Sequence, residues 1–232
     1  MDWFKRKNKQ YFSYDHDIHS HILPGLDDGV KRVEDSVVIV KKMLELGVKQ
    51  FSFTPHISFP SPMNTPEIIL EKLNELKERL LKEKIEIEAD AGAEYKIGEY
   101  MIDLIRQGNI ASFHGGKVLV EHSFVAPSPA FEEVIFRLQD KGYTPVLAHP
   151  ERYPFYMKHL TERVWELKRR GCRIQVNLLS FVGFYGKEAM AGARELLVAR
   201  LIDYFSGDIH SVKQVELLEK FLKSKESEKL LV

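Results

Sequence analysis

The sequence predicts a single-domain α/β protein in which seven strand–helix units form a closed or nearly closed barrel. Segments with strand patterns alternate with segments of helical apolar spacing seven times along the 232 residues, which indicates a parallel sheet. The connections are short, and no linker rich in proline, glycine or serine divides the chain. In such barrels, the side chains that carry chemistry lie at the carboxyl ends of the strands.

Seven segments have the residue alternation or the short apolar runs that are typical of strands. In the second of them, for example, Phe51 and Phe53 alternate with polar residues. The strands are expected at 13–19, 49–54, 85–91, 117–120, 144–148, 173–176 and 202–205.

Apolar residues at helical spacing fill the intervals between these strands. In the first interval, valine and leucine recur on one face until Gly47 ends the helix. The second helix opens with Thr65 and Pro66, an N-cap followed by a first-turn proline. The helices are expected at 33–46, 65–80, 98–107, 128–142, 157–170 and 187–200, with a last one that contains Val215, Leu218 and Leu222.

Composition excludes several classes of protein. The 34 basic and 34 acidic residues give zero formal net charge, which argues against a general nucleic-acid binder. The chain contains no apolar run of 18 residues, so no membrane insertion is expected. Residues 1–12 form a basic extension without the apolar run of a secretory signal. We therefore expect a cytoplasmic protein, with a frayed tail at 223–232.

The single cysteine, Cys172, excludes an internal disulfide and a cysteine-based zinc cluster. We expect it to pack as a small apolar residue.

Nine candidate metal ligands fall at the carboxyl ends of the expected strands or in the loop after the first strand. His19 and His21 are two residues apart, so in a strand they point the same way. Histidine and carboxylate together suit Zn, Mn or Fe, and nine ligands are about right for two or three ions. The candidates are His19, His21, Asp28, His56, Glu94, Glu121, His149, Asp208 and His210.

Several nearby residues have packing as the alternative to a role at the metals. Asp27 competes with Asp28 for the ligand position, and the other would then cap a turn or hydrogen-bond to a ligand. His122 follows Glu121 and should point to the other side of its strand. His16 and Asp17 are expected to pack or hydrogen-bond near the strand end, and His114 and His159 are expected at the surface.

With these residues in view, the chain resembles the PHP (polymerase and histidinol phosphatase) superfamily. Within it, the chain is similar to the bacterial metal-dependent protein-tyrosine phosphatases of capsule and exopolysaccharide clusters. The similarity spans residues 14 to 215 and lies in Asp17-Ile18-His19-Ser20-His21-Ile22-Leu23-Pro24-Gly25-Leu26-Asp27-Asp28-Gly29, Thr54-Pro55-His56, Gly92-Ala93-Glu94, Val120-Glu121, Ala148-His149-Pro150-Glu151-Arg152-Tyr153 and Asp208-Ile209-His210.

The resemblance implies a distorted (β/α)7 barrel, the PHP fold, which is TIM-barrel-like, with two or three divalent ions, Mn foremost and Fe or Zn as alternatives. One ion would bind His19, His21, Glu94 and Asp208. A second would bind Glu94 as a bridge, with Glu121 and His149. A third would bind Asp28, His56 and His210.

The resemblance also implies attack on phosphorus by a metal-activated hydroxide, with Arg152 and His149 as catalytic residues. Arginine's planar fork suits phosphate, so Arg152, together with Tyr153, is the expected substrate-binding residue; an ion pair with Glu151 or another acid is the structural alternative for Arg152. The aromatic rim could include Phe59, Tyr153, Phe155, Phe181, Phe184 and Tyr185.

The implied substrate is a phosphotyrosine protein, a bacterial tyrosine autokinase of polysaccharide export. A histidinol-phosphate or other small-molecule phosphatase, an amidohydrolase-like metal hydrolase and a non-catalytic metal-binding module remain alternatives.

The chain departs from the family pattern in its basic residues. Relatives tend to carry arginine in the loop after the third histidine and again beyond the final Asp-x-His. Here residues 57–66 contain no basic residue, and Lys213 is the only one soon after His210. Gly207 stands where the family more often has serine.

Overall fold

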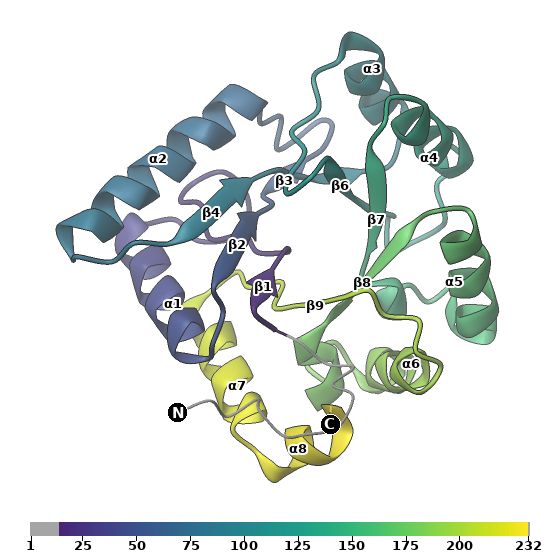
Figure 1. The fold of residues 1–232 in the computed structure, drawn as a ribbon. Coiled ribbons are helices and arrows are strands. Elements are labelled where there is room, and N and C mark those ends of the chain that lie inside the picture. Colours follow the sequence, from purple (N-terminus) through teal and green to yellow (C-terminus); the bar gives the residue numbers. More distant parts are fainter. Residues whose placement is uncertain (1–13, 232) are drawn as a thin grey trace.

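A computed structural model describes residues 14–231 of the chain. The expected basic extension 1–12, residue 13 of the first predicted strand and residue 232 lie outside the described residues. The predicted α/β architecture is confirmed: every pair of neighbouring strands is parallel. Figure 1 shows the strands at the centre of the molecule and the helices around them.

The strands form two sheets that follow one another around this centre. The smaller has the order β1-β2-β4 and the larger the order β3-β5-β6-β7-β8-β9. Their bounds are β1 (His16–Asp17), β2 (Gln50–Phe53), β3 (His56–Ile57), β4 (Glu88–Ala91), β5 (Glu94–Lys96), β6 (Lys117–Glu121), β7 (Thr144–Ala148), β8 (Arg173–Asn177) and β9 (Tyr204–Ser206).

Nine strands reduce to seven strand positions because two predicted strands are continued after a break. Pro55 separates β2 from β3, since proline has no N–H to donate to a ladder. Gly92 lies between β4 and β5, and its N–H donates to Phe53 O at 2.9 Å. A Cβ at Gly92 would lie 2.7 Å from Phe113 Cδ1, so the close approach here requires glycine. Each break comes immediately before a predicted metal ligand.

The first and last strand positions meet beyond the ends of β1 and β9. Ser20 and Ile209 form a parallel bridge, His21 N donates to Ile209 O at 2.9 Å, and Asp208 N donates to His19 O at 2.9 Å. The first and last strand positions are thus adjacent, as in a distorted (β/α)7 barrel, although the strands are divided between two sheets. This contact also places the segment with His19 and His21 beside the segment with Asp208 and His210.

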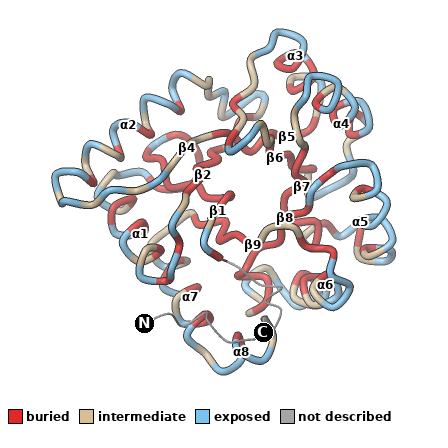
Figure 2. The backbone as a smooth tube through the Cα atoms, viewed as in Figure 1, coloured by how far each residue is buried: buried red, intermediate tan, exposed pale blue. Residues whose placement is uncertain are grey.

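The helices place apolar faces against the strands, and Figure 2 shows their buried residues turned towards the centre. Thr65 caps α2 as predicted, because its side chain accepts a hydrogen bond from Ile68 N. The helices are α1 (Val33–Glu45), α2 (Pro66–Lys82), α3 (Glu99–Gln107), α4 (Phe131–Asp140), α5 (Leu160–Arg169), α6 (Lys187–Val198), α7 (Val212–Leu222) and α8 (Lys225–Leu231). Short 3-10 helices cover Pro150–Arg152, Met157–His159 and Leu178–Val182.

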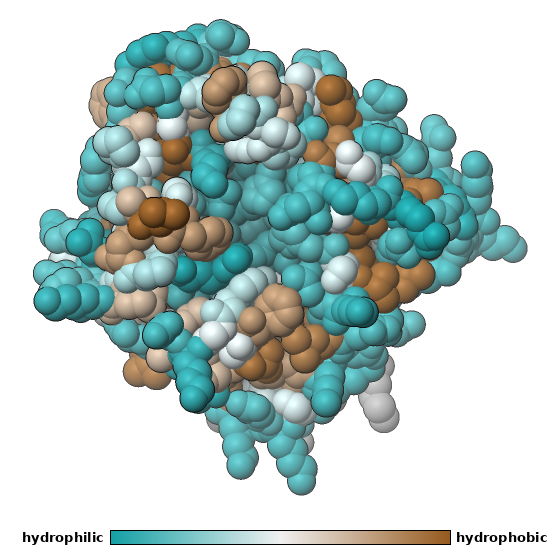
Figure 3. Space-filling view, turned by 180° about the vertical axis from the view of Figure 1, so that it is seen from behind, coloured by the Kyte–Doolittle hydropathy of each residue, from teal (hydrophilic) through white to brown (hydrophobic). Residues whose placement is uncertain are grey.

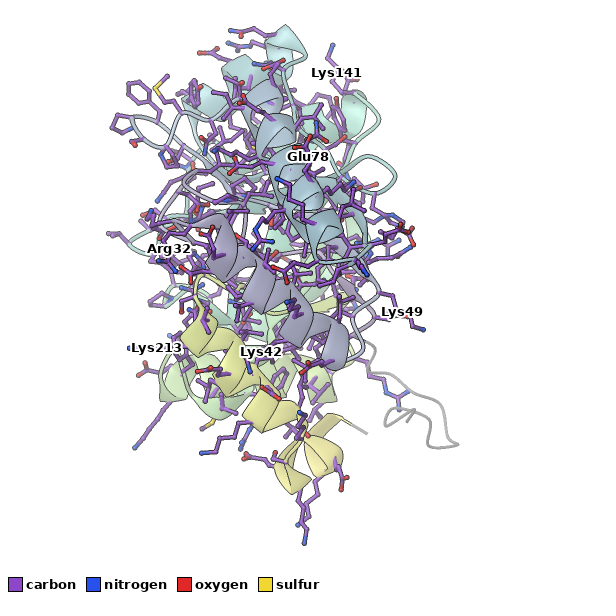
Figure 4. The ribbon with its side chains drawn as sticks, turned by 90° about the vertical axis from the view of Figure 1, so that its left-hand side faces the viewer. Arg32, Lys42, Lys49, Glu78, Lys141 and Lys213 are labelled. Carbon is purple, nitrogen blue, oxygen red and sulfur yellow. The ribbon has the colours of Figure 1, made fainter. Side chains whose placement is uncertain are left out.

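Helices α1 and α7 lie side by side although they are far apart in sequence (Figures 1 and 4). Lys42 on α1 donates to Glu219 Oε2 on α7 at 2.9 Å. This pair joins the first strand–helix unit to the last, on the outside of the barrel.

The prediction of a frayed tail at 223–232 is wrong for the described part of that segment. Residues Lys225–Leu231 form α8, and Ser227 is buried, with its hydroxyl donating to Leu222 O at 3.0 Å. Leu230 packs against the core. This helix was not predicted because its sequence is mostly charged. A short surface helix needs only one apolar face, which here includes Leu230. Helix α4 also begins later than predicted, at Phe131, after a turn in which Phe131 N donates to Ser128 O.

Cys172 is buried, as predicted. Burial raises the pKa of its thiol to about 12. Within residues 14–231, no helix has the length and apolar character that crossing a membrane requires.

Candidate metal centre

The nine predicted ligands converge at the carboxyl ends of the strands. The structure groups them into four sets of side chains, in each of which one donor atom per residue lies within 4.8 Å of the others. The sets are His19, His21 and Asp208; His19, Glu94 and His149; His56, Glu94 and Glu121; and His21, Asp28, His56 and His210.

These side chains line or underlie a cavity of about 510 Å³. The face of the molecule opposite that of Figure 1 is hollowed near its centre, and hydrophilic residues gather in the hollow (Figure 3). The cavity lining comprises Asp28, His56, Glu94, Lys96, Glu121, Phe124, His149, Arg152, Tyr185, Asp208, His210 and Gln214.

His19 and His21 are the deepest of the histidine ligand candidates and are fully buried. Their Nε2 atoms are 3.2 Å apart, and each lies 3.4 Å from Asp208 Oδ1. Two imidazole nitrogens and a carboxylate oxygen therefore face one point, which is the arrangement that a shared cation needs.

Glu94 is the carboxylate common to two of the sets. Its Oε2 lies 3.1 Å from His19 Nε2 and 3.2 Å from His56 Nδ1, whereas its Oε1 lies 3.0 Å from His149 Nε2. A carboxylate with its two oxygens in two donor sets can bridge two ions, as the resemblance implied.

The grouping around Glu94 differs from the expected ligand sets in one respect. Glu121 is grouped with His56, whose Nδ1 lies 3.6 Å from Glu121 Oε1. His149 is grouped with His19 instead. Glu121 and His149 both adjoin Glu94, but none of the four sets contains them together.

The third expected set comes together at the mouth of the cavity. Asp28 Oδ1 lies 3.6 Å from His56 Nε2 and 3.6 Å from His210 Nε2. The Asp28 side chain is 71% exposed, in contrast to the buried ligands below. An ion here would therefore be the most accessible to solvent.

The donor set fits divalent cations better than it fits an arrangement of protein atoms alone. Burial and the nearby Glu94 raise the pKa of Glu121 to about 8, because two carboxylates compete in one pocket. Burial disfavours charge on His19, but Glu94 and Asp208 outweigh it and raise the His19 pKa to about 9. His149 Nδ1 is buried without a hydrogen-bond partner among the described residues. Divalent cations would neutralise the carboxylates and coordinate the imidazole nitrogens that face them.

A second layer of polar side chains holds these ligands in place. Asp27 is buried, and its Oδ2 accepts hydrogen bonds from His21 Nδ1 at 2.7 Å and from His56 N at 2.8 Å. The side chain of Asp27 thus orients two candidate ligands, His21 and His56, whereas Asp28 lies among the candidates themselves. Opposing charge on His21 outweighs burial and lowers the Asp27 pKa well below its usual range.

Gln175 and Asn177 belong to this layer and were missed by the sequence analysis. Gln175 Oε1 lies 2.9 Å from His19 Nδ1, and Asn177 Nδ2 donates to Asp208 Oδ2 at 2.6 Å. The sequence did contain an indication of this role: Gln175 and Asn177 are two residues apart at the end of β8, so their side chains lie on the same side of the strand.

Arg152 is held at the edge of the cavity by a carboxylate and two aromatic rings. Its Nη1 donates to Asp208 Oδ2 at 2.7 Å. The guanidinium carbon lies 3.9 Å from the Tyr185 ring centroid and 4.7 Å from that of Phe124. The carboxylate partner is thus Asp208, whereas Glu151 is buried and accepts from Asn177 N and Ser180 Oγ.

The placement of Tyr153 corrects the expectation that it contacts substrate. Tyr153 is fully buried; its hydroxyl donates to Ala148 O and accepts from His122 N. Its ring packs edge-on against His149. Tyr153 therefore packs behind the candidate ligand His149.

The remaining aromatic residues divide between core and surface. Phe181 is fully buried and Phe155 packs against the core, so neither forms a rim. Tyr185 lines the cavity, and Phe59 and Phe184 are exposed on the loops after β3 and β8. Phe124, which the sequence analysis missed, also lines the cavity and is 40% exposed.

The other histidines and acids lie where they were expected, in packed positions or at the surface. His122 is buried, with its Nε2 3.0 Å from Tyr156 Oη. Asp17 is buried and accepts from Tyr14 Oη at 2.7 Å and from Gly207 N at 2.8 Å. His16 contacts Ser52 Oγ at 2.9 Å, and His114 and His159 are exposed.

Gly207 is compatible with its crowded surroundings. A Cβ at this position would lie 2.6 Å from Ile209 Cγ1. Glycine in place of the serine typical of the family therefore accords with the packing of Ile209 in this chain.

Comparison with known proteins agrees with this geometry. A family model described as "Capsular polysaccharide synthesis, CpsB/CapC" matches residues 15–219. The tyrosine-protein phosphatase YwqE of Bacillus subtilis is 33% identical over 204 residues, covering 85% of this chain and 78% of the relative. The putative tyrosine-protein phosphatase CapC of Staphylococcus aureus is 27% identical over 197 residues, covering 84% of this chain and 77% of the relative.

Solved structures show the same fold. One from a study of YwqE from Bacillus subtilis and CpsB from Streptococcus pneumoniae, described as metal-dependent tyrosine phosphatases, has a TM-score of 0.78 and 30% identity. It covers 93% of this chain and 90% of that chain. A phosphotriesterase homology protein from Escherichia coli has a TM-score of 0.55 at 13% identity, covering 94% of this chain and 92% of that chain; it supports the fold alone.

Proposed function

Because the chain belongs to the CpsB/CapC family of capsular polysaccharide synthesis, we propose that it is a metal-dependent protein-tyrosine phosphatase. The observation that carries the proposal is the convergence of nine histidine and carboxylate ligands on a cavity that also contains Arg152. The relatives named tyrosine-protein phosphatases match most of this chain.

The proposed ligands are the nine residues grouped above, and they would hold two or three divalent ions. Mixed imidazole and carboxylate ligands suit manganese, iron and zinc. We place manganese first because of the resemblance to the PHP superfamily, with iron or zinc as alternatives. When bound, such ions activate water as a nucleophile near neutral pH and neutralise charge on phosphoryl oxygens. Cys172 has no part in this chemistry, because it is buried in the core.

The residues of the chain itself bind and orient the substrate. Arg152 would donate to the phosphoryl oxygens with the N–H groups that Asp208 does not use. Because arginine has five donors in a planar fork, one bond to Asp208 leaves several for phosphate. Phe124 exposes part of its ring at the same edge of the cavity and would stack on the tyrosyl ring of the substrate.

His149 has a positioning role in this proposal as well as a ligand role. It lies between Glu94, which its Nε2 contacts, and the ring of Phe124, whose centroid is 5.7 Å away. The side chain therefore joins the metal ligands to the aromatic surface on which the leaving tyrosine would lie.

The proposed biological substrate is a phosphotyrosine protein, a tyrosine autokinase of polysaccharide export, encountered in the cytoplasm. The family's role in capsular polysaccharide synthesis supports this partner. A cavity of about 510 Å³ also has room for a small phosphate ester, so the substrate class must be tested directly.

The test compares substrates on protein depleted of metal by a chelator and then supplied with Mn, Fe, Zn, Co or Mg. The substrates are p-nitrophenyl phosphate, a phosphotyrosine peptide and histidinol phosphate, and a His149→Ala variant is measured in parallel. We expect metal-restored, His149-dependent hydrolysis of the phosphotyrosine peptide, well above that of histidinol phosphate. The opposite preference would reassign the substrate, and no hydrolysis with any metal would refute the proposal.

A further inference from the structure

The cavity contains two basic side chains, and they are held very differently. Arg152 is paired with Asp208 and lies against two aromatic rings. Lys96 lines the same cavity and is exposed. Among residues 14–231, no side chain forms an ion pair or a hydrogen bond with the Lys96 ammonium. Its charge is therefore available to a ligand.

The position of Lys96 follows from the strand that carries it. Lys96 is the last residue of β5, two residues after Glu94, so the two side chains point to the same side of the strand. In the pairing of β5 with β6, Lys96 lies opposite Glu121. The ammonium group is thus directed into the cavity from the same strand as the bridging carboxylate.

Four carboxylates line this cavity, yet none pairs with Lys96. Asp28, Glu94 and Asp208 each contact histidines or Arg152, and Glu121 contacts His56. The charge of Lys96 opposes the rise in the pKa of its register neighbour Glu121, but the two side chains form no ion pair. An exposed lysine in the cavity lining can meet an anion that enters from solvent.

Two of the loops that follow candidate ligands have few basic residues. Residues 57–66, which follow His56, contain neither lysine nor arginine. After His210 the next basic residue is Lys213, which is not among the residues that line the cavity. Of the described residues, Lys96 and Arg152 are the only lysine or arginine side chains in the cavity lining.

We propose that Lys96 binds the phosphoryl group of the substrate, as a second cation beside Arg152. This inference rests on the proposed phosphatase function and deepens it. The phosphate monoester dianion is attracted to an unpaired ammonium group, which donates up to three hydrogen bonds. Because the Lys96 ammonium forms no ion pair among the described residues, substrate binding would break none.

The experiment compares Lys96→Met and Lys96→Arg with the wild-type full chain, all loaded with metal. Lys141→Met is the matched control, because Lys141 is an exposed lysine just after α4 (Figure 4) and does not line the cavity. The substrates are p-nitrophenyl phosphate and two phosphotyrosine peptides, one with neutral and one with acidic flanking residues. Inorganic phosphate serves as a competitive inhibitor, and the metal content of each variant is measured.

Lys96→Met should raise KM for all three substrates, and the inhibition constant of inorganic phosphate, by about tenfold, as expected for the loss of one charge-assisted contact. Lys96→Arg should recover most of the affinity because it keeps the charge. Lys141→Met should match the wild type, and the metal content should be the same in all four proteins.

Three results would overturn the proposal. An unchanged KM and inhibition constant would show that Lys96 does not touch the phosphoryl group. A loss confined to the acidic peptide would assign Lys96 to flanking carboxylates. A fall in metal content would place its effect on the metal centre. If the wild type hydrolyses no phosphate ester, the proposed function fails, but calorimetric binding of inorganic phosphate to the metal-loaded variants still tests Lys96.

Discussion

The carboxamide oxygen of Gln175 lies 2.9 Å from Nδ1 of His19. The amide orientation is fixed by its other contacts, because Gln175 Nε2 donates to Asn177 Oδ1 at 2.8 Å and Oε1 accepts from His149 N. Because Oε1 can only accept, Nδ1 of His19 carries a proton, and Nε2, which faces Glu94 and Asp208, is the nitrogen that would coordinate a cation. One glutamine thus sets the tautomer that a metal ligand requires.

Replacing Gln175 by leucine should lower metal affinity by about 10- to 100-fold, the usual cost of losing a hydrogen-bond partner of a ligating histidine. Competition with a chelator of known affinity measures this loss. Gln139→Leu is the control, since Gln139 is exposed and its side chain donates to Arg170 O away from the centre. Equal metal affinity in Gln175→Leu and the wild type would contradict this role.

The Tyr185 ring and hydroxyl should make separable contributions to holding Arg152. The hydroxyl donates to Asp208 Oδ2 at 3.2 Å, while the ring lies beneath the guanidinium. Tyr185→Phe keeps the ring and should change kcat/KM by less than about threefold. Tyr185→Ala removes the cation–π contact, worth about 1–2 kcal/mol in a partly desolvated site, and should lower kcat/KM by about tenfold.

Steady-state kinetics on p-nitrophenyl phosphate measure both effects, and Phe184→Ala is the control on the neighbouring exposed ring. If Tyr185→Phe and Tyr185→Ala lost activity equally, the hydroxyl and its contact with Asp208 would matter more than the ring.

The metal-free protein should be less stable than the loaded one. Glu94, Asp208, His19 and His21 are buried together, and their interactions with bound cations exist only in the folded chain. A site filled at 100 times its dissociation constant adds about 2.7 kcal/mol to the free energy of unfolding. Denaturant titrations with and without Mn, each repeated on Glu94→Gln, measure the difference. Stabilisation by Mn that persisted undiminished in Glu94→Gln would contradict the bridging role of Glu94.

The barrel-like architecture and the convergence of the candidate ligands could be predicted because both repeat a simple pattern. Seven strand–helix alternations imply the architecture, and chemistry-bearing residues that recur at strand ends must converge once those ends share one face. The choice between Asp27 and Asp28 could not be predicted in this way. It depends on the turn at residues 25–30, which directs Asp27 inward to His21 and leaves Asp28 exposed between His56 and His210.

The residues that the sequence analysis missed or misplaced share a different cause. Tyr153 follows a conspicuous arginine, but the 3-10 helix Pro150–Arg152 rotates consecutive side chains in different directions and sends Tyr153 into the core. Gln175, Asn177 and Lys96 do not belong to any of the sequence motifs that indicated the site. Their roles arise from the register of β8 and β5 with neighbouring strands, which only the folded chain reveals.

Cys172 offers a prediction that is independent of the metal centre. Burial raises the pKa of its thiol from 9.0 to about 12, so the folded protein holds the proton more tightly than the unfolded chain does. Above pH 9 the unfolded chain loses this proton first, and the free energy of unfolding should then fall with rising pH, by up to about 1.4 kcal/mol per pH unit. Below pH 9 both states keep the proton and this contribution is constant.

Urea titrations between pH 8 and 10.5 on the wild type and Cys172→Ala measure this contribution, because lysines and tyrosines titrate alike in both proteins and only the thiol differs. The stability of the wild type should fall more steeply above pH 9 than that of Cys172→Ala. Parallel slopes would show that the thiol has an ordinary pKa.

The buried thiol should also be unreactive in the folded protein. Iodoacetamide at pH 8 should alkylate Cys172 only as fast as the chain opens. Cys172→Ala, which cannot be alkylated at this position, should retain phosphatase activity, because a metal-dependent route needs no thiolate.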